Sequence, residues 1–555
     1  MIPAVMLPRQ WMPSSRTAAA IVLAVILSAR LTVVARAAGF SLGVAAGDVT
    51  DTTVILWTRA DAPGEVRLDL AGDEWFTTII QSIVATATEE HDLTVKLDVG
   101  SLSPTTRYFY RFVRPDDPEA VSRTGRFRTA PPPDVPAGLR FIFTGDSNFA
   151  LAPFAVLAHA AREDADLFIW FGDVVVTDGF TGGTGPAFTL EEYRAKYKQI
   201  RSDPHVQDLL ARMATWTGWD DHEVYDNYAG LDPDLPTEQR DAAYQAFFEF
   251  MPIRPQNLPD DRFRTYRRFR YGSSIDFFFL DARQYREVSA EGRCGSNPDP
   301  LGFLFGQFTA DPACQDSLST GRSMLGGPQL DWLKSGLGNS AAAVKFVVNN
   351  VAVTYIALLP YDRWDGYDAE RRELLGHIDA NHIAGVVFLT TDSHANAHNP
   401  DLTHYFRCYR PDYLLAGHVV IPELIAGPIG SHTLHGELIR FGASILGPAA
   451  APLAYSLIDQ LEGQIVNRLR LINALAFLDH DRMGYAVINV TADGRADVTY
   501  RGLRPDDARN PEVDIDTLYT SSVLPPPPPP CCCWPLLVVG AAACLVRCGR
   551  SPPWA

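Results

Sequence analysis

Five segments of this chain share one layout, in which an apolar or small-residue run ends directly in carboxylate, amide or imidazole side chains. In chain order the runs end at Gly145-Asp146-Ser147-Asn148, Gly172-Asp173, Asp220-Asp221-His222-Glu223, Asn349-Asn350 and Asp392-Ser393-His394. Short apolar runs bounded by turn residues are typical of strands that are buried on both faces. Side chains at the carboxyl ends of such strands converge on one rim of an α/β sheet. The sequence therefore predicts an α/β fold with a ligand site at this rim.

The residue types at the strand ends are those that a pair of metal ions requires, because two cations need a bridging carboxylate, further oxygen ligands and imidazoles. The candidate metal ligands are Asp146, Asn148, Asp173, Asp221, Asn350, Asp392 and His394. Asp173 is the expected bridge because it follows the most hydrophobic of the runs. Asp146 and His394 are expected to hold one ion, and Asp221 and Asn350 the other.

Two residues are candidates for catalysis. His222 follows Asp221 directly and is placed to donate a proton to a leaving alkoxide. Arg283, together with Arg286, is a candidate for capturing a phosphate group, although structural pairing with Asp281 or Glu287 is the simpler role for these arginines. Taken alone, the stretch around His222 also fits a solvated turn, and the strand ends considered together favour a metal site instead.

The order Gly-Asp, Gly-Asp, Asp-Asp-His-Glu, Asn and Asp-x-His resembles that of calcineurin-like metallophosphoesterases, and more narrowly their alkaline phosphatase D branch. Three further segments resemble the same branch, namely Phe279 to Arg286, Gly327 to Leu333 and Trp364 to Tyr367. The resemblance covers most of the chain, from about Phe40 to about Arg501. It implies a four-layer α/β sandwich, two divalent or trivalent metal ions and phosphomonoesterase or phosphodiesterase activity in a secreted or periplasmic protein.

The chain departs from this family pattern at three positions. Val176 stands where many relatives have a tyrosine, Asp146 where some have an iron-binding cysteine, and Thr391 where a glycine is usual. Without a tyrosinate or thiolate the site is harder and richer in oxygen ligands, so calcium, iron, zinc and manganese all stay candidates. The alternative is a surface-exposed binding protein on a catalytically decayed phosphatase scaffold.

The catalytic domain is expected over residues 137–505, after an all-β domain over 40–131. Short strand-like runs recur in this first part without a helical period, as in an immunoglobulin- or fibronectin-like sandwich. Pro131-Pro132-Pro133 is then a stiff linker. In the second part, helices are predicted over Leu190 to Met213, Thr237 to Phe250 and Leu446 to Ile472, and a hairpin from Tyr485 to Tyr500.

The two ends of the chain differ from the rest. Residues 1–37 fit a signal peptide, with arginines before an apolar run and small residues near Ala37. Residues 506–555 are expected to form a proline-rich tail that contains a short apolar segment, Cys531 to Val546. Three roles are open for this segment: a membrane-contacting anchor, a sorting tail removed after export, or an extension without function. Cys294 and Cys314 are a candidate disulfide, which would leave Cys408 unpaired.

The formal net charge of −18 disfavours nucleic-acid binding as the main role, because long-range repulsion opposes contact with a polyanion. A small phosphate ester would instead be captured locally, by metal ions and arginines. The sequence as a whole therefore predicts a two-metal phosphoesterase acting on phosphate monoesters, diesters or both. The expected location is secreted, periplasmic or at the cell surface.

Overall fold

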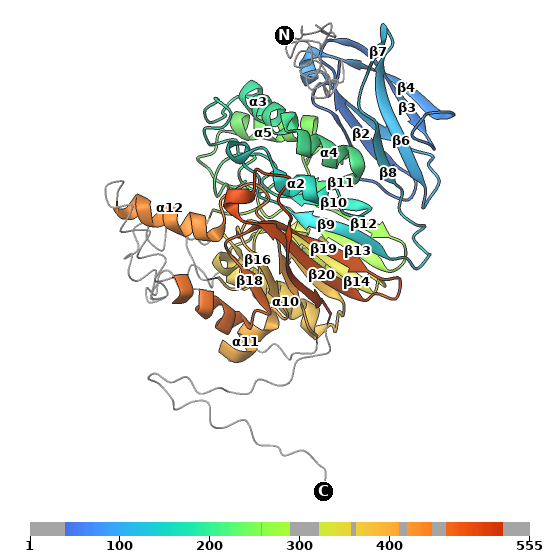
Figure 1. Cartoon of the computed structure of the whole chain (residues 1–555). Helices are drawn as coiled ribbons and strands as arrows, with labels where there is room; N and C mark the ends of the chain where they lie inside the picture. The colour runs from blue at the N-terminus through green and yellow to red at the C-terminus, as the bar shows by residue number, and fades with distance from the viewer. Residues whose placement is uncertain are drawn as a thin grey trace, which may run out of the picture.

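The protein is described here from a computed structural model (Figure 1). The structure describes residues 39–256, 258–288, 321–356, 362–409, 419–446, 462–464 and 466–524. The expected signal peptide, the Cys294–Cys314 pair and the tail from residue 525 onward lie outside these ranges, as does much of the helix expected over Leu446 to Ile472. Within these ranges, no helix has the length and apolar character needed to cross a membrane.

The larger of two central sheets has nine strands. They are β1 (Val44–Gly47), β2 (Val54–Arg59), β5 (Thr94–Val99), β9 (Leu139–Thr144), β10 (Leu167–Phe171), β11 (Ala214–Gly218), β19 (Met483–Val490), β20 (Ala496–Leu503) and β21 (Asp516–Ser522). Their order is β21-β20-β19-β9-β10-β11-β1-β2-β5. Because β9, β10 and β11 are parallel, the polar residues after these strands emerge at one rim.

The second central sheet has seven strands. They are β12 (Arg267–Tyr271), β13 (Ile275–Phe279), β14 (Val344–Asn349), β15 (Val386–Thr390), β16 (Asn396–Asn399), β17 (Glu423–Ile425) and β18 (Phe477–Asp479). Their order is β12-β13-β14-β15-β17-β16-β18. The run β13-β14-β15-β17 is parallel, so β14 and β15 deliver their trailing residues to the same side.

The two sheets pack face to face, and helices cover their outer faces. Phe141 of the first sheet meets Phe277 and Phe346 of the second, with ring centroids 5.4 and 5.3 Å apart. The outer helices are α2 (Ala155–Ala160), α3 (Leu190–Ser202), α4 (Pro204–Arg212) and α5 (Thr237–Phe250) on the first sheet and α9 (Gly327–Gly338), α10 (Asp368–Ala380) and α11 (Thr403–Tyr409) on the second. The expected four-layer α/β sandwich is confirmed.

The expected all-β domain precedes this core and is also confirmed. Its outer sheet contains β3 (Gly64–Ala71), β4 (Ile79–Ala87), β6 (Arg107–Arg114), β7 (Asp117–Val121) and β8 (Gly125–Arg128). Its inner layer is β1-β2-β5, which continues the nine-stranded sheet because β1 pairs in parallel with β11 at Gly47 and Thr215. The backbone comes so close here that a Cβ on Gly47 would lie 2.1 Å from the carbonyl oxygen of Pro252.

Three details differ from the sequence predictions. The helix expected over Leu190 to Met213 is broken into α3 and α4. The Asp203 side chain caps α4 by accepting hydrogen bonds from the amides of His205 and Val206, and a proline occupies the first position of this helix. The globular fold also extends past residue 505, since β21 pairs with β20. Cys408 is disulfide-bonded rather than unpaired.

Candidate metal centre

Four of the predicted ligands lie in tight turns after their strands. Asp146, Asp173, Asp392 and His394 have φ angles of 61°, 48°, 62° and 51°. Residues other than glycine rarely adopt this left-handed conformation, and it persists only where surrounding contacts hold it. The turns hold one another, since the Asp392 amide donates to Asp146 Oδ1 at 3.1 Å and the Ser147 amide to the Asp173 carbonyl at 2.8 Å.

The turns converge on a pocket of about 470 Å³. Its lining includes six of the predicted site residues, namely Asn148, Asp173, Asp221, His222, Asp392 and His394. The carboxylate of Asp146 is fully buried beneath the Asp392 turn, and its Oδ2 atom makes no hydrogen bond within the described part of the chain. A buried carboxylate oxygen without a donor is the environment that a bound cation would satisfy.

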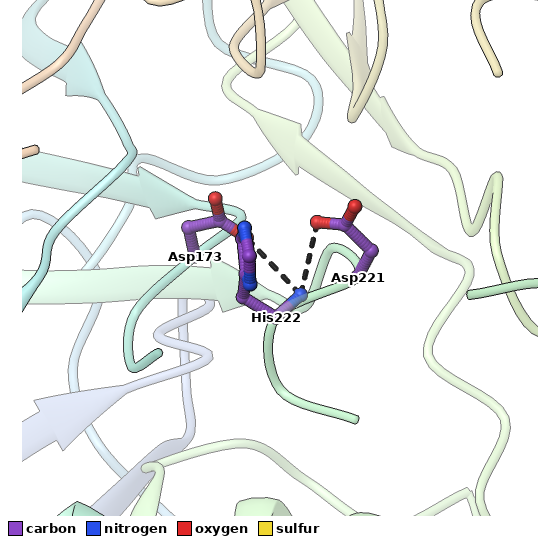
Figure 2. A group of neighbouring side chains, drawn as sticks. All are labelled: Asp173, Asp221 and His222. Carbon is purple, nitrogen blue, oxygen red and sulfur yellow. Dashed lines mark hydrogen bonds between the residues drawn. The ribbon is translucent and has the colours of Figure 1, made fainter. Parts of the chain in front are cut away.

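Two groups of side chains place their ligand atoms within 4.8 Å of one another. The first contains Asp173, Asp221 and His222, which Figure 2 shows gathered in one view. The second contains Asp220, Asp221 and Asp392. Asp221 is common to both groups, so it is a second candidate for the bridging role that the sequence assigns to Asp173.

Crowding and burial of the carboxylates change their ionisation. Burial raises the pKa of Asp146 to about 7, helped by the neighbouring charge of Asp392. Burial also raises the pKa of Asp173 and of Asp220 well above the usual range. Burial opposes the ionisation of Asp221 too, but Arg283 and His222 outweigh it and lower the pKa of this carboxyl. Bound cations would offset this repulsion, so the residues present fit a metal centre.

His222 is oriented by a residue that the sequence did not single out. Its Nδ1 atom lies 2.8 Å from Asp178 Oδ1, and its Nε2 atom lies 3.9 Å from Asp226 Oδ1. Burial disfavours the imidazolium, but Asp173, Asp221 and the bond to Asp178 together raise the pKa of His222 well above its usual value. The only sequence signal for Asp178 is its place in the turn that follows Asp173.

Arg283 is fully buried and binds carboxylates instead of facing the pocket. Its guanidinium contacts Asp220 at 2.5 Å, Asp362 at 3.2 Å, Asp392 at 3.2 Å and Asp221 at 3.5 Å. These partners differ from those expected along the sequence. Arg286 donates to the backbone carbonyls of Asp362, Asn227 and Tyr228. The geometry makes Arg283 a positioning residue for the acidic ligands, and its contact with a phosphate group stays a prediction.

The two predicted asparagine ligands already have backbone partners. Asn148 Oδ1 accepts from the Ala150 amide at 2.9 Å, and Asn350 Oδ1 accepts from the Ala282 amide at 3.0 Å. The Asn350 amide also donates to the Trp219 carbonyl. Their roles as ligands remain untested predictions. His394 Nδ1 lies against the His432 carbonyl, which leaves Nε2 as the ring nitrogen available for a metal.

The sequence also did not single out a cationic side chain, Arg363, in the wall of the metal pocket. Arg363 lines the pocket, and its Nε atom lies 3.3 Å from Asp392 Oδ2. Within the described ranges, neither its Nε nor its Nη1 atom makes a hydrogen bond. Its position directly before the Trp364 to Tyr367 motif was the available signal. Glu437 and Arg440, from α12 (Leu434–Leu446), line the pocket without any such signal.

Sheets packed between helices, with carboxylates and imidazoles at the strand ends, define a metallophosphoesterase-like fold. The sequence profile of the PhoD-like phosphatase family matches residues 141–499. The profile of the PhoD-like phosphatase N-terminal domain matches residues 27–131. The chain therefore belongs to the PhoD-like phosphatase family, which confirms the resemblance.

Individual relatives agree with this assignment. Alkaline phosphatase D of Bacillus subtilis (strain 168) is 30% identical over 396 residues, and the match covers 64% of this chain and 64% of that protein. A solved structure of PhoD superposes with a TM-score of 0.67 at 25% identity, covering 86% of this chain and 89% of the other. The purple acid phosphatase PPD1 from yellow lupin seeds shares the fold, with a TM-score of 0.50, 11% identity, and coverage of 86% and 73%.

Proposed function

We propose that this protein is an exported two-metal phosphoesterase that hydrolyses phosphate monoesters, diesters or both. The observation that carries the proposal is the pair of ligand groups that meet at Asp221 in one pocket. Paired sites of this kind suit in-line displacement at phosphorus, where charge develops on both the attacking and the leaving oxygen. Family membership and the relationship to alkaline phosphatase D support the same chemistry.

The residues that would hold the ions are Asp146, Asp173, Asp221, Asp392 and His394. When bound, two such ions supply a water of lowered pKa and neutralise charge on the phosphoryl group. The ligand set is dominated by carboxylates, which suits hard cations. Calcium, iron, zinc and manganese are therefore the ions to test, as two divalent or trivalent ions per chain.

The chain's own groups would orient the ester and transfer the proton. His222 stands at the pocket with Nδ1 fixed by Asp178, so Nε2 is the atom that donates a proton to the departing alkoxide. Arg363 lines the pocket and would bind a non-bridging phosphate oxygen. Arg283 would act indirectly, by holding Asp220, Asp221 and Asp392.

Asp173→Ala tests the proposal directly. The variant should lose hydrolysis of an aryl phosphate and bind less metal, because no neighbouring group replaces a carboxylate shared between the ligand turns. Asp331→Ala is the matched control, since the Asp331 side chain is 79% exposed on α9. If Asp173→Ala kept full activity with both metals bound, the bridging assignment would be wrong.

The same measurement decides the alternative function. Val176 lines the pocket at the position where many relatives have a tyrosine, which is the feature that favours a decayed phosphatase scaffold with a binding role. A decayed site predicts substoichiometric metal and no turnover in the unmodified protein. Export to the periplasm, the medium or the cell surface is proposed from residues 1–37 and is tested by fractionation of the full chain.

A further inference from the structure

A second pocket, of about 540 Å³, lies between the N-terminal domain and α5. Strands β4 and β5 supply one wall, and α5 with the segment near Phe263 supplies the other. The residues used below are His91, Lys96, Phe248, Glu249, Arg262 and Phe263. None of them lines the metal pocket. The second pocket is therefore a separate feature of the molecule.

Lys96 brings an incompletely paired ammonium group to this pocket. Its Nζ atom donates to the carbonyl of Phe248, and within the described ranges no carboxylate lies at ion-pair distance from it. Burial lowers the pKa of Lys96 to about 8, against the weaker opposing influence of Asp48 and Glu249. This half-buried ammonium group has two remaining N–H groups that can donate to an anion in the pocket.

The wall facing Lys96 is aromatic and carries a second cation. The rings of Phe248 and Phe263 lie 5.7 Å apart and are tilted by 45°. The Arg262 guanidinium stacks 4.2 Å from the centroid of Phe263, and Lys96 lies 5.6 Å from that of Phe248. Arg262 is 65% exposed and contacts Asp241 at the rim. The pocket thus combines two aromatic rings with two cations.

The carboxylate in the pocket wall is already neutralised. Glu249 receives two hydrogen bonds from Arg194 at 2.7 Å and one from Gln245 at 2.9 Å. His91 lies 3.5 Å from the same carboxylate. Glu249 is therefore paired with Arg194, and within the described part of the chain it forms no ion pair with Lys96 or Arg262.

We propose that this pocket binds a small organic anion whose carboxylate pairs with Lys96 and whose aromatic ring packs against Phe248 and Phe263. The ring gains burial and edge contacts with the two phenylalanines. The carboxylate gains charge-assisted hydrogen bonds from Lys96, with Arg262 at the entrance. Neither half of the ligand suffices alone, because the ring surface and the cations occupy one cavity.

Calorimetric titration of the full chain with 2-naphthoate tests the proposal. We expect one molecule of naphthoate to bind per chain. 2-Naphthalenemethanol and acetate should each bind at least about tenfold more weakly, because each lacks one half of the ligand. Lys96→Met keeps the alkyl chain and should weaken naphthoate binding about tenfold. Arg262→Ala should weaken it about threefold, and this exposed position decides the result if Lys96→Met fails to fold.

Arg495→Ala is the control for loss of one positive charge, because Arg495 is 78% exposed in the turn between β19 and β20. It should leave the affinity for naphthoate unchanged. The proposal would be overturned if naphthoate did not bind, or if both Lys96→Met and Arg262→Ala bound it as tightly as the unmodified protein. Displacement of naphthoate by inorganic phosphate, which would place it at the metal centre, would also overturn it.

Discussion

Removing bound metal with a chelator should make the stability of the protein fall as the pH rises from 6 to 8. In the metal-free site, burial raises the pKa of Asp146 and of Glu223 to about 7. An acid whose pKa is higher in the folded state binds its proton more tightly when folded. Its contribution to stability is therefore present at low pH and is lost as the pH rises through 7. Bound cations would hold these carboxylates ionised and remove the effect.

The size of the effect follows from proton linkage. A carboxyl whose pKa moves from its ordinary value to about 7 loses on the order of 1 kcal/mol of stabilisation between pH 6 and pH 8. Asp146 and Glu223 together give on the order of 2–3 kcal/mol. With an unfolding entropy of about 2.1 cal/mol/K per residue, this corresponds to a fall in Tm of about 2–3 °C for a chain of this length.

The assay compares thermal unfolding of chelated and metal-loaded protein at pH 6, 7 and 8. Other groups titrate in this range with the opposite sign, such as His398, whose pKa burial lowers to about 4. They contribute equally to both samples and cancel in the comparison. Asp146→Asn should flatten the slope of the chelated protein, since asparagine tolerates the positive φ of this turn. Parallel slopes for chelated and loaded protein would refute the reasoning.

Three further predictions concern proton transfer and the tail. His222→Ala should lower kcat by about 10²–10⁴-fold for poor leaving groups and by less for nitrophenolate, which departs without a proton. Equal losses for all leaving groups would instead make His222 a metal ligand or a structural residue. Asp178→Asn should lower kcat about tenfold, again for poor leaving groups, and should have no effect in the His222→Ala background if Asp178 acts only by orienting that imidazole. Deleting Pro525 to Ala555 should leave kcat and KM unchanged. If the apolar segment anchors the protein, the deletion should also move activity from the membrane pellet to the soluble fraction. An unshifted distribution excludes the anchor, and lost yield would mean that the tail packs into the fold.

The strand ends could be predicted because their signals are local. An apolar run such as Leu167–Phe171 is buried at every position, so its sequence alone indicates a central strand and places Asp173 at its end. The family's residue order then indicated that these ends meet. The same reasoning located the hairpin at β19 and β20, since Asp493-Gly494 marks a turn between two β-rich runs.

The partners of the polar groups could not be predicted in this way. Asn350 was expected to bind metal and Arg283 to bind phosphate. Instead, Asn350 accepts a hydrogen bond from the Ala282 amide, and Arg283 forms ion pairs with four carboxylates that are distant along the chain. The bond from Asp178 to His222 spans 44 residues. Nothing in the residues themselves says whether a buried polar group satisfies the backbone, another side chain or a bound ion.

The pairing of β1 with β11 means that the N-terminal domain is a structural part of the sheet that carries the metal turns. A shortened protein starting after the proline linker would leave β11 with an unpaired edge directly before Trp219 and the acidic turn. Such an edge is a template for pairing with another chain, and the missing β1 would also remove the contact with Pro252 after α5. Engineering that treats the first domain as a detachable module would therefore produce an aggregating protein with a loosened site, whereas fusions beyond Leu524 leave the sheet intact.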